Sequence, residues 1–136
     1  GIHSIKDAVG DLEFSKNELE VLKGKVDIYS GNDGETIEFM KMGGKGVVSV
    51  ASHIVGNEIY DLINHVLNDE VESAEYLQNQ LLPLFDLLFE EPSPGPVKYL
   101  LTKTWEDVGS PLMPITDISS ELANKLLDNF QKVKNN

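Results

Sequence analysis

Apolar positions follow two different periods along this chain, and the change between them divides the chain into two parts. Up to residue 68, short apolar runs of strand length alternate with segments in which apolar residues recur every three or four positions. The runs at 2–6, 25–30 and 46–52 predict three strands, each followed by a helix. Alternation of this kind indicates parallel strands joined by right-handed crossovers. We therefore expect residues 1–68 to form three strand–helix units.

The third of these runs is apolar on both of its faces. A parallel strand has this pattern when helices cover one face and a barrel interior lies on the other. The helix expected after it has the most regular amphipathic spacing in the chain, with apolar residues at i, i+3, i+4, i+7 and i+8. These residues are Ile59, Leu62, Ile63, Val66 and Leu67. We expect this helix to pack on the third strand.

Residues 69–136 carry helical periodicity alone, and we expect a C-terminal α-helical segment there. The proline-rich sequence that ends at Pro96 is typical of a stiff link, and Pro96 itself suits the first turn of the next helix. Ser119 precedes a last amphipathic run and is expected to cap it. The chain is therefore predicted to change from α/β to all-helical structure near residue 69.

Lys6 stands at the end of the first predicted strand. Side chains alternate between the faces of a strand, so Ile2, Ser4 and Lys6 share one side. Burying an ammonium group costs several kcal/mol unless the group is paired or loses its proton. A lysine that has lost its proton is a nucleophile. Taken alone, the local pattern fits a solvated or weakly paired lysine better than a catalytic one.

Length and charge limit what the chain can be. It has 136 residues, 40% of them hydrophobic, and a formal charge of −12. This is enough for one domain with a core, whereas a (β/α)8 barrel needs about 250 residues. The acidic charge argues against nucleic acid and against an anionic membrane as partners. The sequence contains no cysteine, no long apolar run and no leader-like N-terminus, and we expect a soluble cytoplasmic protein.

Two other patterns were considered as sites. The glycine-rich turn at residues 43–46 resembles a phosphate loop, but it precedes a strand, so the amide donors of a helix N-terminus would be absent. His3, His53 and His65 are far apart in the sequence and form no metal motif. We therefore expect neither a metal nor a cofactor.

Four segments carry a resemblance to a known family: SIKDAVGDL, YSGNDG, GGKGVVSVASH and EEPSPGPVK. In this order and at these intervals they closely resemble the C-terminal half of the dihydrodipicolinate synthase family. That family belongs to the pyruvate-dependent lyases and aldolases that form Schiff bases on a (β/α)8 barrel. The resemblance extends over essentially all of the chain. Ser4 replaces a glycine of the family pattern, and Gly95 replaces a bulkier residue.

The resemblance implies a fold and a site. The fold would be a partial (β/α)8 barrel, namely its last three βα units, followed by the C-terminal helical segment. Lys6 would be the lysine that forms the Schiff base. Gly31 and Val48 would line the pyruvate site, Val48 through its backbone carbonyl.

The resemblance also implies an activity, which is the condensation of pyruvate with L-aspartate 4-semialdehyde on the route to diaminopimelate and lysine. The family's proton-relay tyrosine, threonine pair and substrate-binding arginine belong to its N-terminal half. By itself this chain is therefore expected to be inactive, and to associate with a missing N-terminal half barrel or with itself.

Two alternatives remain open at this point. The chain could come from a related pyruvate-dependent aldolase of the keto-deoxy sugar acid or N-acetylneuraminate type, because these enzymes keep the lysine. It could also be a non-catalytic, truncated half barrel that self-associates, because an open sheet leaves unpaired strand edges.

Overall fold

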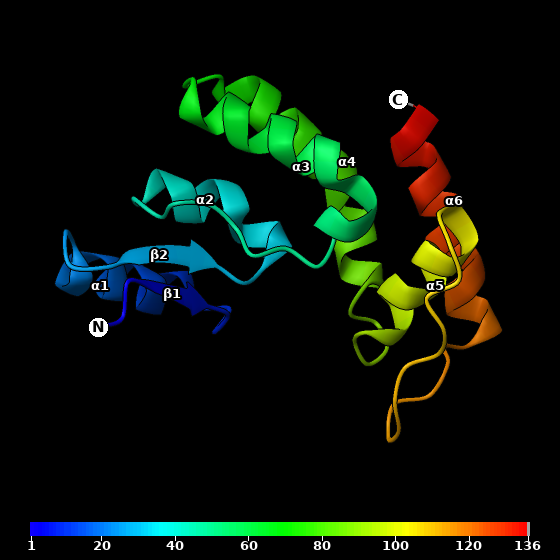
Figure 1. Cartoon of the computed structure of the whole chain (residues 1–136). Coiled ribbons are helices and arrows are strands. Elements are labelled where there is room, and N and C mark those ends of the chain that lie inside the picture. Colours follow the sequence, from blue (N-terminus) through cyan, green and yellow to red (C-terminus); the bar gives the residue numbers. More distant parts are fainter. Residues whose placement is uncertain (136) are drawn as a thin grey trace. The chain divides into compact units, whose positions relative to one another are not determined.

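The computed structural model describes residues 1–135, which form two parallel strands and a series of helices (Figure 1). The elements in chain order are β1 (Ser4–Asp7), α1 (Leu12–Leu22), β2 (Asp27–Ser30), the 3₁₀ helix η1 (Asp33–Glu35), α2 (Thr36–Lys41), α3 (Ser52–Leu67), α4 (Val71–Leu87), α5 (Gly95–Thr104) and α6 (Ser120–Asn135). Contacts divide the chain into two compact units. The first contains Gly1–Ser49 and Glu58–Gln78, and the second contains Val50–Asn57 and the residues from Asn79 on.

The first unit contains the sheet. β1 and β2 are parallel, and their register pairs Lys6 with Tyr29 and Asp7 with Ser30. The prediction of parallel pairing is confirmed. Both strands begin two residues later than predicted and are only four residues long.

The third predicted strand, at 46–52, is wrong in its extent. The chain makes one isolated parallel bridge, between Ser30 and Val47, and a helix begins at Ser52. The Ile54 amide already donates to the Ala51 carbonyl at 2.9 Å, so the end of the run has helical rather than extended hydrogen bonds. Within residues 1–135 no further strand pairs with this segment, which leaves its apolar residues without a ladder on that edge.

Helix α1 begins at a side-chain cap, Asp11. Oδ1 of Asp11 accepts hydrogen bonds from the backbone amides of Glu13 at 2.9 Å and Phe14 at 3.1 Å. These bonds satisfy two of the amides that a helix N-terminus leaves without intrahelical partners. Gly10 precedes the cap with a φ of +77°, a conformation that glycine adopts without a steric penalty. The turn after β1 is therefore fixed by a glycine and a capping aspartate.

The core of the first unit joins α2 to the parts of α3 and α4 that belong to this unit. Ile37, Leu62 and Ala74 are buried together, with Val66 and Leu77 packed against them. One side chain links α4 to the start of α2: Nε2 of Gln78 donates to the Gly34 carbonyl at 3.1 Å, and Oε1 of Gln78 accepts from the Ile37 amide at 3.3 Å. Helix α2, which follows β2 in the chain, is thus held by both apolar and polar contacts.

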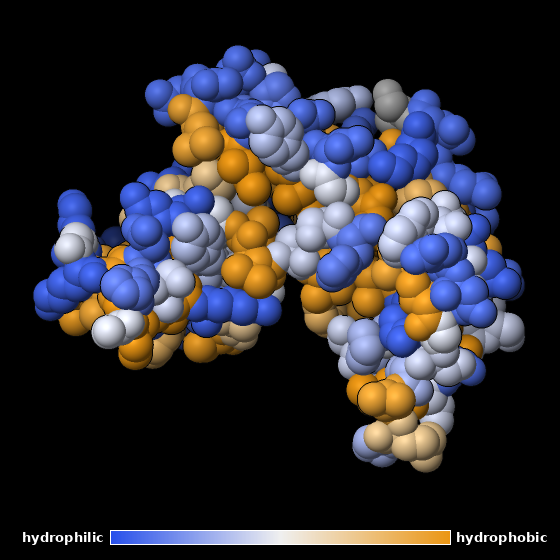
Figure 2. Space-filling view, viewed as in Figure 1, coloured by the Kyte–Doolittle hydropathy of each residue, from blue (hydrophilic) through white to orange (hydrophobic). Residues whose placement is uncertain are grey.

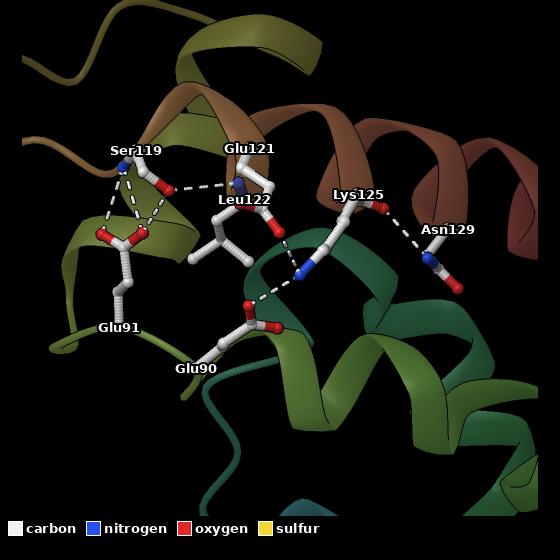
Figure 3. A network of polar contacts seen from close by, with 7 residues as sticks. All are labelled: Glu90, Glu91, Ser119, Glu121, Leu122, Lys125 and Asn129. Carbon is white, nitrogen blue, oxygen red and sulfur yellow. Dashed lines mark hydrogen bonds and ion pairs between the residues drawn. The ribbon is translucent and has the colours of Figure 1, made fainter.

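The second unit is helical, as expected for the C-terminal segment. Pro96 lies in the first turn of α5, and Ser119 precedes α6 with its Oγ accepting from the Leu122 amide at 3.2 Å, so both predictions are confirmed. Figure 3 shows how α6 is attached to the residues after α4: Glu91 accepts hydrogen bonds from Ser119, and Lys125 lies between Glu90 and Glu121. The hydrogen bonds to both glutamates raise the pKa of Lys125.

The predicted division at residue 69 describes the change of secondary structure along the chain, and it stays a prediction as a domain boundary. Figure 2 shows hydrophobic side chains in several places on this face, and among them are side chains near the tip of the loop between α5 and α6. Leu112 and Met113 of this loop are 88% and 81% exposed. No helix within residues 1–135 combines the length and the apolar character that a membrane span requires.

Candidate active site

The C-terminal ends of β1 and β2 and the bridge at Val47 lie side by side in the first unit. Asp7 pairs with Ser30, and Ser30 pairs in turn with Val47. Three neighbouring chain segments at the C-terminal ends of the parallel strands therefore carry Lys6, Gly31 and Val48. In barrels of parallel strands, this end is where catalytic residues are found.

Lys6 lies on the exposed face of the sheet, together with Ser4. Within residues 1–135 its ammonium group makes no hydrogen bond or ion pair. The lysine is thus neither buried nor neutralised by a carboxylate of the described chain. The side chain is accessible to solvent.

Gly31 lies directly against the stem of Lys6. A Cβ atom at this position would be 2.7 Å from Cε of Lys6 and 2.6 Å from Cβ of Ala8, closer than such atoms approach in folded proteins. The amide of Gly31 donates a hydrogen bond to the Asp7 carbonyl, which continues the ladder one residue beyond β2. Glycine is therefore required here by the close approach of Ala8 and Lys6 and not by its own dihedral angles.

Val48 is tied to β2 through its backbone. Its amide donates to the Ser30 carbonyl at 2.8 Å, while the Ser30 amide donates to the Gly46 carbonyl at 2.9 Å. The side chain of Val48 is 47% exposed. The ladder fixes the direction of the main chain at Val48, and the predicted role of its carbonyl stays a prediction.

Asp7, which follows Lys6, lies on the opposite face of the sheet and is buried. Oδ1 of Asp7 accepts from the Val9 amide at 2.9 Å, and Oδ2 accepts from the hydroxyl of Ser15 on α1. Sequence reasoning missed both residues. The sequence did contain a signal for them. Side chains alternate between the faces of a strand, so the residue after Lys6 lies on the face that the following helix covers, and a carboxylate buried there needs hydrogen-bond donors.

Glu18, one turn further along α1, adds a second carboxyl group near Asp7. Its Oε2 is buried and makes no hydrogen bond within residues 1–135. Burial, and secondly the negative charge of Asp7, raises the pKa of the Glu18 carboxyl. The helix side of the sheet end therefore holds two acidic groups that repel each other.

A hollow of this unit lies at the opposite ends of the strands. A surface pocket of about 560 Å³ is lined by His3, Lys25 and Asp27 among others, and it includes none of the three predicted site residues. No group of three histidine, cysteine, aspartate or glutamate side chains within residues 1–135 is arranged to hold a metal ion. The chemistry that the described site offers is that of an accessible primary amine beside a glycine.

Comparison with known proteins shows which family the chain belongs to. Residues 1–133 match the family model of the dihydrodipicolinate synthetase family. The chain belongs to this family. A curated 4-hydroxy-tetrahydrodipicolinate synthase of Listeria monocytogenes is 38% identical over 125 residues, which are 92% of this chain and 43% of that protein. The corresponding enzyme of Bacillus velezensis is 38% identical over 120 residues, 88% of this chain and 42% of the enzyme.

Solved structures of the family have the same fold. Dihydrodipicolinate synthase from Bacillus anthracis superimposes with a TM-score of 0.90 at 38% identity, over 96% of this chain and 44% of that one. The Cyanidioschyzon merolae enzyme, solved with lysine bound, gives 0.92 at 32% identity, over 98% and 45%. The chain thus spans less than half the length of these family members. Its fold is a partial (β/α)8 barrel with a helical C-terminal segment.

Proposed function

We propose that this chain is the lysine-bearing portion of a 4-hydroxy-tetrahydrodipicolinate synthase-type lyase. Lys6 would form a Schiff base with pyruvate, and the bound pyruvate would then condense with L-aspartate 4-semialdehyde in the synthesis of diaminopimelate and lysine. The observation that supports this most is the approach of Lys6 to Gly31 at the C-terminal edge of the parallel strands. Because Gly31 has no side chain, the stem of Lys6 can lie against it, and the amine can then stand at the C-terminal ends of the strands.

The proposed chemistry needs a neutral amine and no cofactor. The Lys6 nitrogen adds to the keto carbon of pyruvate, and loss of water gives the imine. Loss of a methyl proton converts the imine to an enamine, whose carbon attacks the aldehyde carbon of the second substrate. The amino group of the condensed second substrate then attacks the imine carbon and displaces the Lys6 amine, which closes the ring of the product and frees the lysine. Such covalent catalysis divides one difficult step into easier ones.

Gly31 and Val48 would complete the pyruvate side of the site. Gly31 keeps the space beside Lys6 free of a side chain, since even a methyl group there would meet the lysine stem. Val48 would offer its backbone carbonyl, on a main chain that the Ser30 hydrogen bonds hold in place. Neither role depends on a reactive side chain.

A partner should be needed for turnover. A closed, dry pocket favours the neutral amine that attacks pyruvate, whereas Lys6 lies on an exposed face. The family's N-terminal half barrel would cover this face and bring the proton-relay and aldehyde-binding groups. We propose that the chain works with such a half, self-association being the alternative, and that it does so in the cytoplasm, where biosynthetic enzymes of this kind usually act.

The test is an assay of condensation between pyruvate and aspartate semialdehyde. The chain is assayed alone and after mixing with a separately expressed N-terminal portion of a relative such as the Listeria monocytogenes synthase. We expect negligible turnover from either part and measurable turnover from the mixture, lost again with Lys6→Ala. Full activity of this chain as a monomer, or a mixture that accepts only other aldehydes, would contradict the proposal.

A further inference from the structure

The helix side of the strand end is organised around one carboxylate, that of Asp7. This group is buried, with 6% of the residue exposed, directly behind the strand that carries Lys6. A buried charge is costly unless donors surround it. Asp7 has two such donors, the Val9 amide and the Ser15 hydroxyl, and they come from the turn after β1 and from α1.

The main chain of the same residue holds the other part of the site. The Asp7 carbonyl accepts the amide hydrogen bond of Gly31, the residue against which the Lys6 stem lies. Asp7 therefore connects the turn, the helix and the end of β2. Because Lys6 and Asp7 are consecutive in a strand, a rotation of the main chain at Asp7 would also turn the Cα–Cβ direction of Lys6.

Ser15 holds the Asp7 carboxylate in place although the nearby Glu18 carboxyl group repels it. It is 1% exposed, and its hydroxyl lies within reach of both the Asp7 carboxylate and the Asp11 carbonyl, the latter at 3.1 Å. Glu18 contributes a negative charge that repels Asp7. Without the serine donor, the Val9 amide would be the one donor within residues 1–135 that holds the carboxylate against that repulsion.

We propose that Asp7, held by Ser15, is the positioning residue of Lys6: the two form a clasp behind the strand that sets the direction of the reacting amine. The inference rests on the proposed Schiff-base function of Lys6 and deepens it. Asp7 touches no substrate, since it faces the helix. Its effect is on where the Lys6 nitrogen stands, and small displacements of a reacting group lower rates steeply.

The test measures formation of the pyruvate adduct in the chain mixed with the N-terminal portion of a relative, trapped with borohydride and quantified by peptide mass mapping. Lys132, which is exposed and on α6, serves as internal reference in every sample. Ser15→Ala should lower the ratio of Lys6 adduct to Lys132 adduct by about tenfold. Asp7→Ala should lower it at least as much, and Asp7→Asn should restore it to within about threefold, because the amide can accept from Val9 and donate to Ser15 Oγ.

A matched control separates positioning from stability. Asp11→Ala removes the cap of the same helix and leaves Asp7 and its donors in place. It should lower the melting temperature about as much as Ser15→Ala without changing the adduct ratio. Equal ratios for Ser15→Ala and the wild type, or an equal loss with Asp11→Ala, would overturn the clasp. A wild type with no preference for Lys6 would instead overturn the proposed function itself.

Discussion

Replacing Gly31 by alanine tests the geometry of the site with a single methyl group. An ideal Cβ at Gly31 would lie 2.7 Å from Cε of Lys6, 2.6 Å from Cβ of Ala8 and 3.1 Å from the Asp7 carbonyl oxygen. Carbon atoms in contact prefer separations of about 3.5–4.0 Å. The new methyl group therefore requires a displacement of about 1 Å in its surroundings.

The cost of this displacement is shared between two unequal neighbours. Ala8 is fixed by the backbone of the turn, so movement there distorts the Asp7–Gly31 hydrogen bond. The Lys6 stem is flexible and can swing away, but its nitrogen then leaves the strand end. Overpacking of this kind costs about 1–3 kcal/mol of stability, and a misplacement of about 1 Å can cost on the order of a hundredfold in rate.

The assay combines denaturant unfolding with borohydride trapping of pyruvate on Lys6. Gly31→Ala should lose about 1–3 kcal/mol and most of the Lys6 adduct. Gly56→Ala is the matched control, because a Cβ there meets nothing within 4 Å and alanine favours the helix by up to about 1 kcal/mol. A Gly31→Ala protein with wild-type stability and wild-type labelling would refute the steric argument.

Two further substitutions test individual polar groups. Glu18→Gln should raise the free energy of unfolding at pH 7, because the raised pKa of Glu18 means that its charged form is disfavoured beside Asp7 in the folded state. Melting measured as a function of pH should show this gain in stability appear as the pH rises through the folded-state pKa of Glu18. The gain should vanish below the ordinary pKa range of a carboxyl group. Ser119→Ala should cost about 1–2 kcal/mol, since the Leu122 amide and Glu91 both lose a hydrogen-bond partner, and a helical circular-dichroism melt with an unchanged midpoint would contradict this.

The sequence was sufficient for elements whose structure is set locally. Ser119 caps α6 as predicted, because the cap depends on the next three residues. The run at 46–52 was predicted as a strand from its apolar residues alone. Strand length, however, depends on partners from elsewhere in the chain, and here only Val47 forms a bridge.

The candidate site was predicted in part. The family resemblance pointed to Lys6 and Gly31, but the reason for the glycine comes from the strand register, which no single segment contains. Ser15 was missed because its hydroxyl acts on a residue eight positions earlier, across a turn. A buried carboxylate under a helix could have prompted a search for such a donor.

The central claim is that Lys6 differs chemically from the other lysines of this chain. The chain contains eleven Lys and Arg residues, all of them lysines. Incubation of the chain, mixed with the N-terminal portion of a relative, with pyruvate and borohydride, followed by peptide mass mapping of every lysine of this chain, measures this difference directly. The account predicts that the reduced pyruvate adduct is concentrated on Lys6 and that Lys6→Ala abolishes it without increasing labelling elsewhere. An adduct spread evenly over all the lysines would contradict the account and make Lys6 an ordinary surface amine.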